Sequence, residues 1–174
     1  MQTPHSSSYP ESNMGHTDEM TLLLNFVGVW SGEGCGVYPT IRPFIYDEVL
    51  AFELDHDQTA LHYVQKALVR ENRPSHMESG FMKVLPSGHI QLSNAQNGGR
   101  VEVLTGQIQE IKGGVSLELF SSVLDNDPRM VQTHRVYTIV DNQLSYEAGM
   151  STTTTDTPQL QNHLRAQLRK MKGN

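Results

Sequence analysis

Hydrophobic and polar residues alternate with a period of two over most of the chain, from residue 28 to residue 152. Short clusters of Gly, Pro, Asn and Asp interrupt the alternation, and no long helical segment intervenes. Consecutive strands joined by such tight turns pair in antiparallel fashion. The expected strands lie near 30–37 and at 44–54, 60–70, 76–85, 89–96, 101–111, 115–123, 131–140 and 143–152.

The last segment, 160–171, fits two periodicities. Leu160, Leu164 and Leu168 share a helix face, whereas Leu164, Ala166 and Leu168 share a strand face. We favour a tenth strand, because closing the sheet into a barrel removes its unpaired edges. The expected fold is therefore all-β: a ten-stranded antiparallel β-barrel, similar to lipocalins and fatty-acid-binding proteins, with a short N-terminal helix.

The N-terminal region differs in character from the rest. Residues 1–19 are polar and rich in Ser and Pro, so we expect a disordered tail before one barrel domain at 20–174. Within that domain, Met20, Leu23 and Val27 lie on one helical face. This spacing predicts a helix of about two turns that caps or plugs the barrel.

Composition excludes several classes of partner. The formal net charge is −6, which argues against binding to a phosphate backbone. No apolar run approaches the ~20 residues that span a bilayer, and the start lacks a secretion signal. The only cysteine, Cys35, excludes an internal disulfide and fits a reducing compartment. We expect a cytoplasmic protein that acts on small molecules, without nucleic-acid or membrane partners, as a monomer or homodimer.

Glycine dominates one face of the first expected strand. Alternate positions from Gly28 to Gly36 are glycine except for Trp30. Each glycine in a strand costs roughly 0.5–1 kcal/mol relative to alanine, so something must fit against this face. One interpretation is a flat ligand or a close backbone approach inside the barrel, and the other is a sharp bend of the strand. Trp30 is expected to close one end of the core.

The string Gly28-x-Trp30-x-Gly32-x-Gly34-x-Gly36-x-x-Pro39 resembles the signature of the nitrobindin family, which includes the C-terminal domain of a THAP-type zinc-finger protein. Similar stretches occur along about residues 20–172: Tyr38-Pro39-Thr40-Ile41, Glu78-Ser79-Gly80-Phe81, Met150-Ser151-Thr152-Thr153-Thr154 and His163-Leu164-Arg165-Ala166. The resemblance implies a barrel that holds one haem b per subunit near an open end.

The resemblance also implies roles for single residues. His163 matches the proximal ligand of the haem iron, and its second ring nitrogen then needs a hydrogen-bond partner. The alternative is a surface histidine beside Arg165 and Arg169. Thr40 matches a haem contact whose hydroxyl either bonds a propionate or ends the strand. His76 matches a pocket position away from the axial ligand, or is a half-buried histidine without a chemical role.

Further residues are implied as pocket walls. Gln96 and Met150 match lining positions, although core packing also accounts for Met150. If a flat ligand lies against the glycine face, it contacts Gly32, Gly34 and Gly36. Cys35 points to the opposite strand face, so we do not expect a thiolate ligand.

The function implied by the resemblance is isomerisation of peroxynitrite to nitrate by a ferric haem b that is also able to bind nitric oxide. Two other functions fit a barrel of this size. One is a carrier of a fatty acid or another hydrophobic small molecule. The other is a non-catalytic sensor of nitric oxide or haem.

Overall fold

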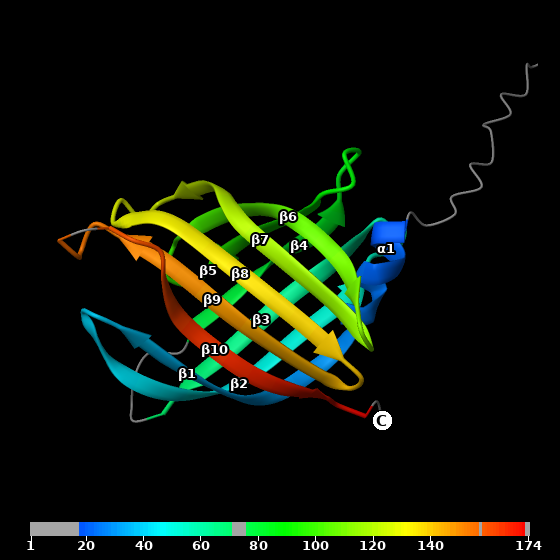
Figure 1. The fold of residues 1–174 in the computed structure, drawn as a ribbon, viewed down its shortest axis with the longest axis horizontal. Coiled ribbons are helices and arrows are strands. Elements are labelled where there is room, and N and C mark those ends of the chain that lie inside the picture. Colours follow the sequence, from blue (N-terminus) through cyan, green and yellow to red (C-terminus); the bar gives the residue numbers. More distant parts are fainter. Residues whose placement is uncertain (1–17, 71–75, 157, 173–174) are drawn as a thin grey trace, which may run out of the picture.

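Ten antiparallel strands close into a barrel (Figure 1). The computed structural model describes residues 18–70, 76–156 and 158–172. The elements are α1 (Asp18–Leu23), the 3-10 helix η1 (Leu24–Phe26), β1 (Gly28–Tyr38), β2 (Ile41–Leu54), β3 (Ala60–Val69), β4 (His76–Val84), β5 (Ile90–Gln96), β6 (Val101–Ile111), β7 (Gly114–Asp125), β8 (Met130–Val140), β9 (Gln143–Thr152) and β10 (Gln161–Lys170). The predicted fold is confirmed, including a strand for the last segment.

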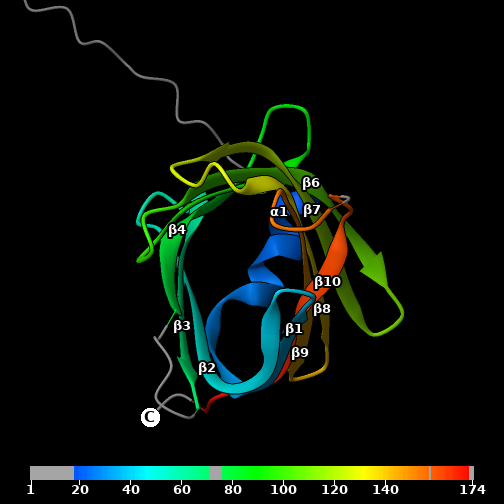
Figure 2. The ribbon, with the colours of Figure 1, turned by 90° about the vertical axis from the view of Figure 1, so that its left-hand side faces the viewer.

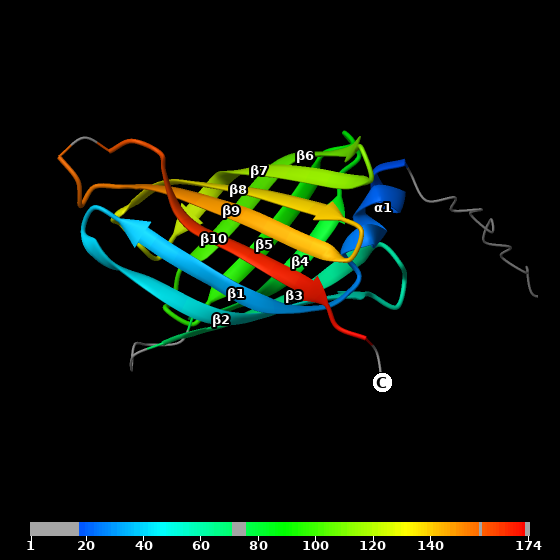
Figure 3. The same ribbon diagram turned by 60° about the horizontal axis from the view of Figure 1, so that its bottom comes forward.

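Each strand pairs with its neighbour in sequence, and β10 returns to pair with β1. In Figure 3, β10 lies between β1 and β9. The short turns that were visible as Gly, Asn and Asp clusters make this order possible, because they reverse the chain within a few residues. Gly113, in the β6–β7 turn, has a φ of +81°, which favours glycine.

Helices α1 and η1 lie across one end of the barrel, and Figure 2 shows α1 at the far end of the barrel axis. Met20, Leu23 and Phe26 are buried there, as expected for a plug. Residues 1–17 of the predicted tail lie outside the described residues, whereas Asp18 and Glu19 belong to α1. No helix in the described part of the chain is long and apolar enough to cross a membrane.

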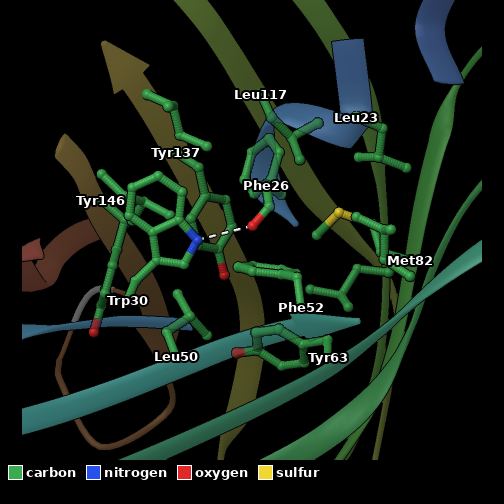
Figure 4. Packing of buried hydrophobic residues seen from close by; sticks show 14 of the residues in the cluster. Leu23, Phe26, Trp30, Leu50, Phe52, Tyr63, Met82, Leu117, Tyr137 and Tyr146 are labelled. Carbon is green, nitrogen blue, oxygen red and sulfur yellow. Dashed lines mark hydrogen bonds between the residues drawn. The ribbon is translucent and has the colours of Figure 1, made fainter. Parts of the chain in front are cut away.

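Trp30 fastens this plug to the barrel (Figure 4). Its indole Nε1–H donates a 2.8 Å hydrogen bond to the Phe26 carbonyl oxygen. The Phe26 ring packs edge-on against Phe52 and Tyr137, at centroid distances of 5.2 and 6.0 Å. All four side chains are buried, so Trp30 closes one end of the core as expected.

The other half of the interior is polar. The inward face of β2 that carries Leu50 and Phe52 also carries Glu48, nearer the opposite end. Glu78, Glu102 and Arg135 are likewise buried. Dense apolar packing in the α1 half therefore gives way to a mixed polar and apolar lining in the other half.

Close packing explains the glycine face of β1. A Cβ on Gly32 would lie 2.1 Å from a backbone carbonyl oxygen of β10. A Cβ on Gly34 or Gly36 would lie 2.2 or 2.3 Å from the ring of Tyr46 or Phe44, respectively. Of the predicted possibilities, a close approach of backbone and side chains therefore accounts for this face.

We expect Gly32→Ala to destabilise the protein by about 2 kcal/mol, because the added methyl group overlaps the paired backbone of β10. Gly98→Ala is the matched control, since a Cβ there meets nothing within 4 Å. Its stability should stay within about 0.5 kcal/mol of the wild type. Urea unfolding followed by the fluorescence of the single tryptophan measures both. Equal stability of the two variants would contradict the packing explanation.

Candidate functional site

A cavity of about 410 Å³ lies inside the barrel, at the end opposite α1. Its mouth is formed by the β5–β6 and β7–β8 turns, which contribute Gly98, Arg100, Asp127 and Arg129. Four residues predicted for the site line it: His76, Gln96, Met150 and His163. The barrel thus brings together side chains that lie far apart in the sequence.

A larger open depression, of about 810 Å³, lies along β1, β8, β9 and β10. Its wall includes the surface residues Glu33, Cys35 and Glu147, and of the predicted site residues only Gly34. The other predicted residues lie elsewhere, so the interior cavity is the candidate site.

His163 lies at an irregularity in the strand pairing. The β9–β10 register shifts between Asn162 and Leu164, and the β1–β2 register shifts between Gly36 and Tyr38. A bulge turns a side chain away from the face that strict alternation would give it. His163 accordingly lines the cavity together with its neighbour Leu164.

The imidazole of His163 is held in one tautomer. Its Nδ1 lies 2.9 Å from the carbonyl oxygen of Val37. A carbonyl only accepts hydrogen bonds, so Nδ1 carries the hydrogen and Nε2 keeps a free lone pair. The rings of Tyr38 and Phe44 approach the imidazole at centroid distances of 5.7 and 6.1 Å, which limits its rotation. Val37 supplies the partner whose identity was open from the sequence.

The imidazole is also neutral at ordinary pH. Burial lowers the pKa of His163, and the nearby charges of Arg100 and His76 act in the same direction. The hydrogen bond to Val37 opposes these effects without reversing them. A neutral, oriented imidazole with a free Nε2 is the form that binds a metal.

The cavity floor is a buried ion-pair network centred on Arg135. Its guanidinium donates to both oxygens of Glu78, with 3.0 Å from Nη2 to Oε2, and also to Glu102. Burial alone would raise the pKa of each carboxyl, but the Arg135 charge lowers it below the usual range. All three groups are therefore ionised.

A second polar cluster, centred on Glu48, lies deeper in the barrel. Tyr146 donates to the Glu48 carboxyl over 2.9 Å, and Gln65 donates to the same group. The hydroxyls of Tyr146 and Tyr46 are 2.7 Å apart. Burial raises the pKa of Glu48 to about 7, and among the described residues no cation forms an ion pair with its carboxyl group.

The other predicted residues have distinct surroundings. The Nε2 atom of His76 is 3.6 Å from Oε2 of Glu78, and its side chain is 37% exposed. The Gln96 amide donates to Glu78 over 3.1 Å and to Glu102 over 2.8 Å. Thr40 is exposed in the β1–β2 turn and is not among the residues that line the cavity.

Gly32, Gly34 and Gly36 do not line the interior cavity either. Their face is covered by β10 and by the rings of Tyr46 and Phe44. A direct contact between these glycines and a flat ligand therefore does not follow from the geometry. Their effect on the cavity is indirect, because both rings form part of its wall.

The charged floor of the site was not predicted from the sequence. Glu78 and Arg135 occupy positions that alternate with outward-facing residues and share a face with the buried Met82 and Tyr137. Charges at inward positions of an otherwise apolar face were therefore a usable signal. The pairing of Glu78 with Arg135 could not be predicted in this way, since 57 residues separate the two along the chain.

Comparisons with known proteins cover most of the chain. The family model described as "THAP4-like, heme-binding beta-barrel domain" matches residues 19–170. A peroxynitrite isomerase of Arabidopsis thaliana is 36% identical over 150 residues, which cover 86% of this chain and 87% of that protein. Peroxynitrite isomerase 2 of Mycobacterium ulcerans is 30% identical over 156 residues, covering 87% and 94%. The crystal structure of Rv2717c from M. tuberculosis has a TM-score of 0.78 at 28% identity, covering 90% and 99%.

We expect Glu48→Gln to change how stability depends on pH. The folded pKa of about 7 exceeds the ordinary 4.5, so the unfolded chain releases this proton at lower pH than the folded chain. As the pH rises from 4.5 to about 7, ionisation of Glu48 therefore lowers the free energy of unfolding, by about 3 kcal/mol in total. Relative to the wild type, the variant should gain this amount between pH 5 and pH 8 in urea unfolding. A constant difference would contradict the shifted pKa.

Arg135→Met should destabilise the protein by about 3 kcal/mol or more at pH 7, because two buried carboxylates lose their cation. The loss should shrink at pH 4, where the stranded carboxyls take up protons. Arg129→Met is the control, since its side chain is 69% exposed and its ion pair with Asp127 is worth at most about 1 kcal/mol. Thermal unfolding of both variants at the two pH values tests this. Similar losses for both would contradict the central role of Arg135.

Proposed function

Since the chain belongs to the family of THAP4-like haem-binding β-barrel domains, we propose that it binds haem b through His163 and isomerises peroxynitrite to nitrate. The observation that carries this proposal is the His163 imidazole, which is neutral, fixed by Val37 and left with a free Nε2. The relatives that are named peroxynitrite isomerase, and that match most of this chain, support the activity.

The residues present fit such a cofactor. One imidazole is sufficient to hold an iron whose other ligands come from a porphyrin. The cavity that His163 lines opens at the end of the barrel, and its wall combines the Phe44 and Tyr46 rings with polar groups. This mixture suits a molecule with a flat apolar body and a charged edge.

When bound, the haem supplies a Lewis-acidic iron at which peroxynitrite rearranges to nitrate, and to which nitric oxide binds in the reduced state. The protein's own residues hold the cofactor and orient the imidazole that binds it. Val37 keeps the proton on Nδ1 of His163, so that Nε2 is free to act as an electron-pair donor on a residue that lines the cavity. The rings of Tyr38 and Phe44 restrict the orientation of the imidazole.

We further propose that His76, Gln96 and Met150 contact the cofactor from the cavity wall. The bonds of Gln96 to Glu78 and Glu102 hold its amide in place, and Glu78 lies beside His76. Thr40, in the exposed turn between β1 and β2, is a proposed contact for a propionate at the mouth. Gly34 and Gly36 act by giving room to the Tyr46 and Phe44 rings.

A fatty-acid carrier is a weaker alternative, because the floor of the cavity is charged. An acyl chain that reached this floor would lie against Glu78, Glu102 and Arg135, which are hydrogen-bonded to one another and unsuited to an apolar tail. A non-catalytic sensor differs from an enzyme only in turnover, so a measured rate separates the two.

We expect the wild type reconstituted with hemin to show a Soret band that His163→Ala loses or shifts. His62→Ala is the control, because the His62 ring lies 3.2 Å from the Ser79 hydroxyl and His62 is not among the residues that line the cavity. In stopped-flow mixing, the hemin-loaded wild type should accelerate the decay of peroxynitrite and raise the yield of nitrate, and His163→Ala should not. A native spectrum in His163→Ala would refute the ligand assignment. Normal haem binding without accelerated decay would favour the sensor.

A further inference from the structure

Arg100, which lines the cavity at its mouth, carries a buried side-chain donor without a hydrogen-bond partner among the described residues. It follows a tight turn in which Gly99 N–H donates to the Gln96 carbonyl and Gln96 N–H donates to the Arg100 carbonyl, each over 2.9 Å. These bonds fix its backbone at the entrance, and its side chain lines the cavity. In the described part of the chain, its Nε is one of two buried side-chain nitrogen or oxygen atoms without a hydrogen-bond partner.

Such a donor is costly when nothing accepts from it. A buried N–H without an acceptor loses about 1–3 kcal/mol relative to water, and a charged group loses more. Natural interiors rarely retain such groups, and an unsatisfied one at a binding cavity indicates a missing partner. A ligand with an acceptor at this point would remove the cost.

The other two arginines that line the cavity are already engaged. Arg129 binds both carboxylate oxygens of Asp127, over 2.9 and 3.1 Å. Arg135 is shared by Glu78 and Glu102. Of these three arginines, only Arg100 retains a buried nitrogen without a partner among the described residues.

The charges of the cavity wall balance only when Arg100 is included. Glu78, Glu102 and Asp127 face Arg100, Arg129 and Arg135, so the wall is neutral only because Arg100 contributes. The whole chain carries a formal charge of −6, which repels an approaching anion. Among the described residues, the Arg100 guanidinium forms no ion pair within 4 Å, although its charge acts on Glu102 and Asp127, and at the entrance it offsets part of that repulsion.

We propose that Arg100 binds an anionic oxygen group at the cavity mouth, donating its Nε–H and one Nη–H as a fork. Two sources have this chemistry: a carboxylate of a porphyrin seated in the cavity, and a small oxyanion that moves toward the iron. The inference rests on the proposed function for the identity of the anion. The guanidinium and its free donor do not depend on His163 as a ligand.

The first arm of the test uses metal-free protoporphyrin IX, so that iron ligation plays no part. The full chain, Arg100→Gln and the control Arg169→Gln are titrated with protoporphyrin IX and with its dimethyl ester, followed by porphyrin fluorescence. Arg169 is exposed on β10, and its replacement changes the net charge equally. If a porphyrin carboxylate is the ligand, Arg100→Gln weakens binding of the acid about tenfold or more and leaves the ester unaffected.

The second arm uses the hemin-loaded proteins and formate as the oxyanion probe. If a small oxyanion is the ligand, Arg100→Gln leaves porphyrin affinity unchanged, and formate binding at the haem weakens about tenfold. Arg100→Lys, which keeps the charge but loses the fork, should recover part of either effect.

Two results would overturn the proposal. In one, Arg100→Gln matches Arg169→Gln within twofold for acid, ester and formate. In the other, Arg100→Gln weakens binding of the acid and of the ester equally and lowers the thermal midpoint of the protein, which shows a structural role for Arg100. If His163→Ala keeps a native haem spectrum, the proposed ligation fails, but the protoporphyrin titration still decides the role of Arg100.

Discussion

The barrel depends on the closure of β1, which pairs with β2 on one side and with β10 on the other. Closure requires a face nearly free of side chains, because the β10 backbone approaches Gly32 and aromatic rings cover the next two glycines. Where the glycines end, Val37 and His163 lie at register shifts in the pairing and are joined by a hydrogen bond. The contacts that close the sheet therefore also aim the imidazole.

The interior contains two kinds of packing: a close-packed apolar core and a hydrogen-bonded ion-pair network. Near α1, apolar side chains around Trp30 and Phe26 pack closely and bury surface that stabilises the fold. At the other end, Arg135 and its two carboxylates hold one another by directed bonds. A network of that kind keeps its shape because each group is satisfied by its neighbours, and it does not collapse into adjacent space. The cavity remains beside it for this reason.

Strand positions could be predicted because the face of a strand residue repeats every two positions, and the turns carried recognisable residues. His163 could not be placed in this way. Strict alternation puts it on the face opposite Leu164 and Ala166, and only the register shift at Asn162 brings it to the cavity. The resemblance to a known family indicated the residue, while its partner Val37 required the register of two ladders, which periodicity does not contain.

In the part of the chain that the structure describes, the helical plug covers one end of the barrel, and the cavity lies at the other end. With Met20, Leu23 and Phe26 buried at the plugged end, Arg100 and the neighbouring turns border the way into the cavity at the opposite end. Binding of a large flat molecule and the entry and exit of small ligands would then use the same opening. A large flat molecule bound in the cavity would form the surface that a small ligand then contacts. The association and dissociation rates of small ligands would therefore depend on how deep in the cavity the large molecule is bound.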